Sequence, residues 1–388
     1  MKRTNLLVGL LLTVGLVLGS LQGCKGPEGP AGPAGESKIL QLEGFAPDIN
    51  CGDCHNPDTD STYFVWAKRY QWELSKHYYG GDYERDSYPS AGCHTTEGFI
   101  ERAKANFPPQ TAWSGVVTAH IDASPPGCFA CHSPHSNGDF RRRTEAPVTL
   151  LSPMSGVADQ TVDLGTGNIC LNCHQPRSLS PQMPQNPAVT DSISITSSRW
   201  YPHYGVQGLM FKGAGSGGGF EFPSKTYSNS PHPTQAAITA EGCVTCHMAD
   251  AVPGSGIAGG HTMNIHFTGP HGEDNWLTSG CTQSGCHSSM SDVETYVSTS
   301  ASLTGGMGVR AFVEANLDTL DQLLIAKGYI DSTGLVVASS GSPLKIPAIK
   351  AGALYNYFFL EHDMSAGVHN SKYAIQLLLD SIEELRKP

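Results

Sequence analysis

The sequence predicts a mainly α-helical fold with extensive irregular loops, ending in a helical C-terminal region. Residues 45–300 are dense in Cys and His, with Gly, Pro and Ser between them, and show no sustained strand alternation. Residues 301–388 contain no cysteine and repeat apolar residues at helical spacing. The chain has 44 Gly and 26 Pro in 388 residues and only 15% charged residues, which is typical of a loop-rich protein.

The N-terminus has the pattern of an export signal. Two basic residues precede an apolar stretch from Leu6 to Leu18, and the segment Leu-Gln-Gly-Cys ends at Cys24. The stretch is too short to span a bilayer, so residues 1–23 are interpreted as a signal peptide. The last four residues resemble the cleavage box of bacterial lipoproteins, which implies lipid anchoring through Cys24 at the outer membrane or cell surface. The alternative is an ordinary signal peptide and a periplasmic protein.

Residues 24–44 are interpreted as a Gly/Pro-rich linker. Its Gly-X-Y triplets favour a stiff extended spacer over a collagen-like trimer, because a triple helix needs three chains and usually many more triplets. A second Gly-rich segment, residues 213–219, is expected to be a flexible loop; no strand precedes it, so it is not interpreted as a phosphate-binding loop. The net charge of −11, with no basic run, argues against a nucleic-acid partner.

Three helices are expected after residue 300. The first covers residues 308–327, where apolar residues recur at helical spacing. Pro347 begins the second, which continues through Phe359, and Asn370 or Ser371 caps the last. We expect these helices to form a bundle that braces the Cys/His-rich region.

The motif Cys-x-x-Cys-His occurs four times. The copies are Cys51-Cys54-His55, Cys128-Cys131-His132, Cys170-Cys173-His174 and Cys243-Cys246-His247. In such a motif the two thiols add to the vinyl groups of a haem, and the adjoining His binds the iron as its proximal ligand. Zinc sites or disulfides are the alternatives. Four copies in an exported chain favour covalent haem.

Two further segments depart from this spacing. Cys281–His287 has four residues between its thiols, and the longer loop can still reach both vinyl groups. Ser90 stands where the first cysteine would be, ahead of Cys93 and His94, so a haem there would be held by one thioether. The alternative is a free or oxidised Cys93 beside an ordinary His, but a lone thiol in an oxidising compartment needs a reason. The sequence therefore predicts five to six groups of haem c.

Ten of the 16 histidines lie outside these motifs and are candidates for the second, distal axial ligand. Imidazole on both faces closes the iron and suits it to electron transfer. The ten are His77, His120, His135, His203, His232, His261, His266, His271, His362 and His369.

Over most of its mature length the chain resembles the exported multihaem cytochromes related to cytochrome c nitrite reductase and hydroxylamine oxidoreductase. The strings that carry the resemblance are Trp72–His77, Cys93–Phe99, Cys131–His135, Tyr201–Gly205, Tyr227–His232, Cys243–Met248, Gly259–Thr262, Tyr355–Tyr357, Gly367–Asn370 and Tyr373–Leu379. The resemblance implies a multihaem cytochrome c architecture. It also implies distal ligands at His77, His135, His203, His232, His261 and His369, with the last supplied by the C-terminal region. His120, His266, His271 and His362 are held in reserve, and Ser90 departs from the family pattern.

These observations predict electron transfer at the cell envelope or surface, within an extracytoplasmic respiratory route. The expected partners are other redox proteins or extracellular electron acceptors, and no catalytic residue is assigned. One alternative is a reductase or oxidase of a small nitrogen or sulfur compound, but the Lys that replaces one motif His in nitrite reductases does not occur here. A second alternative is a homo-oligomer or a subunit of a haem filament, in which surplus histidines would serve neighbouring chains.

Overall fold

A computed structural model describes most of the chain beyond the linker. The described residues are 58, 64–80, 82–133, 140–250, 257–269, 271–283, 285–288, 290–297 and 301–388. The signal peptide, Cys24, the Gly/Pro-rich linker, the first motif (Cys51, Cys54 and His55) and His135 lie outside them. Across the described part, every helix is too short or too polar to be a membrane span.

Short helices and turns dominate the Cys/His-rich region, and its longest helices have nine residues. The α-helices are α3 (Val65–Glu73), α4 (Lys76–Tyr79), α5 (Ala91–His94), α6 (Thr96–Lys104), α7 (Cys128–Cys131), α8 (Asn168–Leu171), α9 (Gln207–Lys212), α10 (Ala236–Glu241), α11 (Val244–His247) and α12 (Ala301–Thr304). The 3-10 helices are η1 (Asp82–Glu84), η2 (Gln110–Ala112), η3 (Gly165–Gly167), η4 (His232–Thr234) and η5 (Gly260–Thr262).

In the described residues, eight short strands pair in twos. Antiparallel pairs join β1 (Val148–Leu150) to β3 (Gln160–Val162), β5 (Ser192–Ile195) to β8 (Leu344–Pro347), and β6 (His266–Thr268) to β7 (Asp274–Trp276), and a parallel pair joins β2 (Met154–Ser155) to β4 (Met183–Pro184). In the β5–β8 pair, Ile193 lies opposite Ile346 and both are buried. Strands of two to four residues are too short for alternation to reveal them in a sequence.

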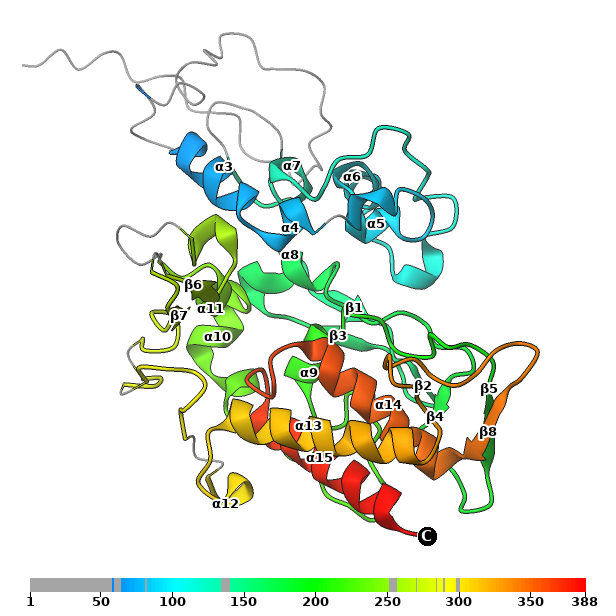
Figure 1. Ribbon diagram of the computed structural model, residues 1–388. Helices are drawn as coiled ribbons and strands as arrows, with labels where there is room; N and C mark the ends of the chain where they lie inside the picture. The colour runs from blue at the N-terminus through cyan, green and yellow to red at the C-terminus, as the bar shows by residue number, and fades with distance from the viewer. Residues whose placement is uncertain are drawn as a thin grey trace, which may run out of the picture. The chain divides into compact units, whose positions relative to one another are not determined.

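Three long helices end the chain, α13 (Val309–Ala326), α14 (Ala348–Asp363) and α15 (Ser371–Arg386). Each packs against the other two, and they lie side by side as the orange to red ribbons in Figure 1. Asn370 precedes α15, but its side chain does not cap the helix: its Oδ1 accepts from the Ser230 backbone at 2.8 Å and its Nδ2 donates to Asn229 at 2.9 Å. Asn370 therefore ties α15 to a distant loop.

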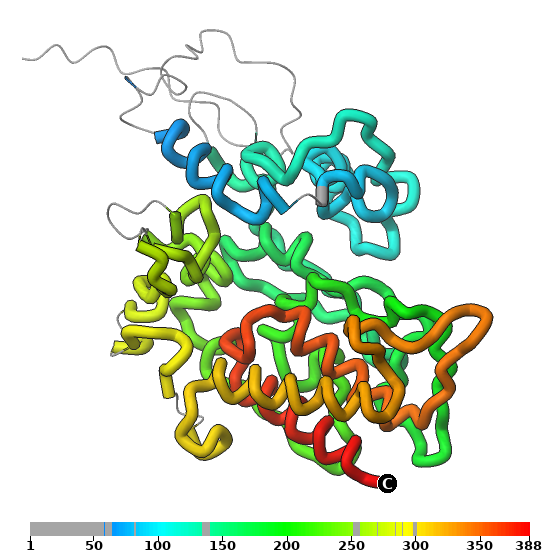
Figure 2. The backbone as a smooth tube through the Cα atoms, viewed as in Figure 1, coloured from blue at the N-terminus to red at the C-terminus, as the bar shows by residue number. Residues whose placement is uncertain are grey.

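One apolar core joins these helices to the segment before them. Buried residues of the core come from residues 148–222 and from residues 309–385. The two segments, green and orange to red in Figure 2, lie against each other along α14. Helix α14 is buried on nearly all sides, with Leu354, Tyr355 and Phe359 fully inaccessible to solvent. The C-terminal helices thus share their core with the Cys/His-rich region.

Residues 213–219 are not a flexible loop, so that expectation is wrong. Most of the segment is buried. A Cβ on Gly218 would lie 2.9 Å from the Phe359 ring, and one on Gly219 would lie 2.4 Å from Leu377. The backbone is also bonded, because Tyr355 donates its hydroxyl to the Gly218 carbonyl at 2.6 Å. Glycine is required here for close packing of the backbone.

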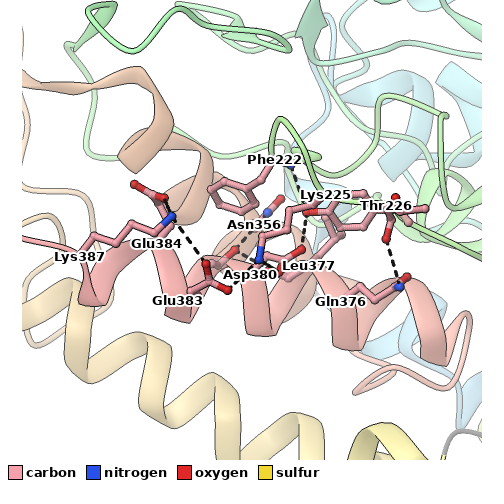
Figure 3. A network of polar contacts seen from close by, with 12 residues as sticks. Phe222, Lys225, Thr226, Asn356, Gln376, Leu377, Asp380, Glu383, Glu384 and Lys387 are labelled. Carbon is pink, nitrogen blue, oxygen red and sulfur yellow. Dashed lines mark hydrogen bonds and ion pairs between the residues drawn. The ribbon is translucent and has the colours of Figure 1, made fainter.

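Polar contacts fasten α15 and α14 to residues 220–228 (Figure 3). Lys225 lies 3.0 Å from Asp380 and 2.7 Å from Glu383. Asn356, which is fully buried, accepts from the Phe220 backbone N–H at 2.7 Å and donates to the Phe220 carbonyl at 2.9 Å. The amide therefore satisfies both backbone groups of a residue that has no ladder partner.

We expect Asn356→Ala to destabilise the fold by about 2 kcal/mol or more, because it leaves two buried backbone groups unpaired. The measurement is the midpoint of denaturant unfolding at unchanged slope. Asn316→Ala is the control, since that side chain bonds only the Phe312 carbonyl of its own helix. Equal midpoints for the two variants would contradict this account of Asn356.

Candidate haem-binding sites

Single helical turns present most of the motif cysteines. Helices α7, α8 and α11 each contain or adjoin a Cys-x-x-Cys pair, and α5 contains Cys93 and His94. Positions i and i+3 lie on the same side of a helix, so one turn directs both thiols of a motif to one side. Within the described part of the chain, no two cysteines are joined by a disulfide.

Each described motif histidine faces a second histidine. The distances between ring centroids are 6.1 Å for His94–His203, 6.3 Å for His132–His261, 6.3 Å for His174–His77, 6.3 Å for His247–His369 and 5.7 Å for His287–His232. Two imidazoles bound to opposite sides of one metal ion, each through a bond of about 2 Å, have their centroids about 6 Å apart. Four of the pairs therefore have the spacing of two axial ligands, and the fifth is slightly closer, because Nε2 of His287 and Nε2 of His232 lie 3.4 Å apart where two such bonds need about 4 Å. We name each site after its motif histidine.

A pair of imidazoles fits haem better than zinc. A structural zinc ion needs four protein ligands, whereas the porphyrin leaves only the axial positions of its iron to the protein. In the part of the chain that the structure describes, no three His, Cys, Asp or Glu side chains are grouped to hold a bare metal ion.

The structure brings together five of the six predicted distal residues with motif histidines, namely His77, His203, His232, His261 and His369. The reserve histidines have other neighbours. His120 lies 3.2 Å from Glu101, His266 stacks on Trp276, and His362 lies against Tyr204 with centroids 4.2 Å apart. His271 is exposed.

The second ring nitrogen of six of these histidines has a partner. The partner of Nδ1 is a backbone carbonyl in three of them: His132 (Phe140, 2.5 Å), His247 (Met263, 3.1 Å) and His232 (Val368, 3.0 Å). It is a side-chain oxygen in the other three: His174 (Gln207 Oε1, 3.1 Å), His287 (Tyr296 hydroxyl, 2.9 Å) and His369 (Asp363 Oδ1, 2.8 Å). An acceptor at Nδ1 keeps the proton there, so the lone pair of Nε2 is left for a metal.

Burial keeps most of these rings neutral. Burial, with help from the neighbouring histidines, lowers the pKa of His77 and of His247 to about 4. It lowers the pKa of His203 to about 3, with the charge of Arg177 as the next cause. His369 differs: burial alone would lower its pKa, but the charge and hydrogen bond of Asp363 outweigh burial and raise it. A neutral imidazole is the form that binds a metal.

Thiols of different motifs lie close enough to shift one another's pKa, which the sequence did not indicate. The interacting pairs are Cys93 with Cys173, Cys170 with Cys243, and Cys246 with Cys281. The backbone is equally close, because a Cβ on Gly167 would lie 2.9 Å from the Cys243 nitrogen and one on Gly280 would lie 2.8 Å from Cys246 Cα. The cysteine motifs of neighbouring sites therefore lie close together.

A buried cation, Arg102, links the His94 site to the His174 site. Only 1% of its surface is exposed, and its guanidinium donates to the Gly92 carbonyl at 2.9 Å and the Asn172 carbonyl at 2.8 Å. The group also lies 4.1 Å above the ring of Trp113. A hydrogen bond with Cys173 and, against burial, the charge of Arg102 lower the pKa of Cys93 to about 7. Nothing in the sequence distinguished this Arg from the other residues of α6.

No protein-family model matches the chain, and none of the curated proteins compared with it matches significantly. The chain is similar to one solved structure, the crystal structure of outer cell wall cytochrome OcwA, with 16% sequence identity and a TM-score of 0.43. The match covers 82% of this chain and 50% of the other, so the chain spans about half the length of that cytochrome. Residue roles in this chain are therefore argued from its own geometry.

We expect Arg102→Lys to weaken the link between the His94 and His174 sites by about 2 kcal/mol. An ammonium can replace Nη1, which bonds both carbonyls, but it loses the bond from Nη2 to Asn172 Oδ1 and the planar stacking on Trp113. Amide hydrogen exchange of residues 91–104 measures the local loss. Arg69→Lys is the matched control, since its exposed ion pair with Glu73 is worth less than about 1 kcal/mol. Unchanged amide exchange in Arg102→Lys would show that the guanidinium is not needed to link the His94 and His174 sites.

Proposed function

We propose that the chain is a multihaem c-type cytochrome with six haems, which transfers electrons outside the cytoplasm. The observation that carries the proposal is the set of five facing histidine pairs, each of which contains a motif histidine. The motifs predict a haem at each of the five sites from local sequence alone. The pairing of each motif histidine with a second histidine comes from tertiary structure. Two independent features thus support the same cofactor.

The residues fall into three groups by their proposed role. Thioether bonds would form at Cys51, Cys54, Cys93, Cys128, Cys131, Cys170, Cys173, Cys243, Cys246, Cys281 and Cys286. The proximal ligands would be His55, His94, His132, His174, His247 and His287. The distal ligands of the last five would be His203, His261, His77, His369 and His232, in the same order. His135 stays a predicted distal ligand to which no haem is assigned.

A bound haem supplies one-electron chemistry, because its iron changes between the ferric and ferrous states. The protein's part is to hold an imidazole on each face of the iron. Two strong ligands leave no open position for a substrate, so this arrangement favours a carrier over a reductase or oxidase. The lowered pKa of the buried rings other than His369 supports the same role, since a neutral imidazole loses no proton when it binds.

The contacts between thiols order the sites along a line. Cys93 to Cys173, Cys170 to Cys243 and Cys246 to Cys281 give the order His94, His174, His247 and His287. The His132 site branches from it, because Cys131 packs with Cys170 and Cys173 around Phe99, Ala130 and Ile169. Haems held at attachment points this near one another would be close enough to exchange electrons, and the His174 site would be the branch point.

The export signal and the lipoprotein-like box at Cys24 support a place for this route at the cell envelope. Lipid anchoring would hold the chain at the outer membrane or surface, where other redox proteins or extracellular electron acceptors could exchange electrons with it. Assembly into a homo-oligomer or filament remains the alternative to test by electron microscopy of the purified protein.

Carbon monoxide titration of the reduced protein tests closed ligation. We expect negligible binding in the wild type, and binding at one haem of the six in His77→Ala, because that change opens one iron. His271→Ala is the control, since the ring is exposed, and it should leave the titration unchanged. Binding to a sizeable fraction of wild-type haem would contradict a pure carrier.

Intact mass under denaturing conditions tests the single-thioether site. We expect six haems in the wild type and five in Cys93→Ala, because no other thiol in that motif can retain the haem. Ser90→Cys should keep six. A wild-type mass that fits five haems would exclude covalent attachment at Cys93.

A further inference from the structure

One distal ligand has a carboxylate behind it. Of the six Nδ1 contacts described above, the one at His369 reaches Asp363, at 2.8 Å, whereas the other five reach a carbonyl, an amide or a phenol. Asp363 is itself buried, with 2% of its surface exposed, and its second oxygen accepts from the Ser365 hydroxyl. Ser365 also accepts from the His369 backbone at 3.3 Å, so the three residues form one unit.

The position of Asp363 is costly. It is the last residue of α14, where the helix dipole is negative and a carboxylate is disfavoured. Burial of an ionised carboxylate adds a further penalty unless hydrogen bonds compensate for it. Here His369 and Ser365 supply those hydrogen bonds. They stabilise a carboxylate at a position where the helix dipole and burial both disfavour it.

Positive charges surround other sites. Arg177 and Arg85 act on His203 in the His94 site, and Lys68 acts on both rings of the His132 site. A positive neighbour favours the reduced iron, which carries one charge less, and a negative neighbour favours the oxidised iron. At the His247 site the group bonded to a ring is instead the carboxylate of Asp363, and the nearby Arg310, which donates to the Ser365 carbonyl at 3.2 Å, is paired with Glu294 and Glu314.

We propose that Asp363 is a positioning residue that lowers the reduction potential of the His247 site below those of the His94 and His132 sites. The inference rests on haem binding at these pairs. A carboxylate that accepts from Nδ1 makes the imidazole a stronger electron donor, and this stabilises the oxidised iron. The His247 site lies inside the line of attachment points, so electrons that follow this line would pass through a haem whose potential Asp363 lowers.

Potentiometric titration of the loaded protein tests the proposal. In Asp363→Asn we expect the equilibrium constant for reduction at one low-potential haem to rise at least tenfold, which is about 59 mV for a one-electron couple. Asp380→Asn is the control: it removes a carboxylate that is bonded to Lys225 and Tyr227, and it should leave every wave in place.

Ser365→Ala separates charge from geometry. It removes a donor to the carboxylate and keeps the negative charge, so the midpoint potential of the same haem should stay unchanged or fall. An upward shift in Ser365→Ala, or no upward shift in Asp363→Asn, would overturn the role of Asp363. A wild type with no histidine-ligated low-spin haem would instead refute the proposed function, so the two failures are distinguishable.

Discussion

Opposed imidazole rings are the constraint on which the rest of this structure depends. Each of the five described pairs brings a motif histidine to within about 6 Å of a ring from elsewhere in the chain. His369 comes from more than 100 residues beyond His247, and His77 from almost as far before His174. Loops can hold such distant residues in place only if the cofactor or a rigid core fixes both ends.

The C-terminal helices supply that core. Helix α14 is buried against residues 148–222 and ends at Asp363, which bonds His369 just before α15 begins. Asn356 on the same helix satisfies the backbone of Phe220. The helix thus links the apolar interior to His369 of the His247 site, and the stability of the fold and the placement of His369 depend on one element.

Local patterns in the sequence predicted the attachment points, because a Cys-x-x-Cys-His motif is contiguous and its spacing carries the chemistry. The distal histidines have no such local pattern. Their choice came from resemblance to known cytochromes, and the structure places five of them against motif histidines. The contacts between motifs and the bridging role of Arg102 depend on tertiary packing, which no spacing in the chain reveals.

Residues 213–219 are a case in which a local sequence pattern was present but predicted the wrong structure. Gly-rich composition predicts a mobile loop when the backbone is free in solvent, yet the same residues permit close packing when the backbone is buried. Only the neighbours distinguish the two cases, and here they are Leu209, Phe359 and Leu377. The short strands were missed for a related reason, since pairs of two to four residues depend on their partner strand.

Magnetic circular dichroism of the fully oxidised protein in the near infrared tests the central claim most directly, because it reports the axial ligands of every ferric haem. The account predicts low-spin bands of histidine–histidine ligation for all the haems present. High-spin features, or methionine-ligated bands, on a sizeable fraction of the haem would contradict it.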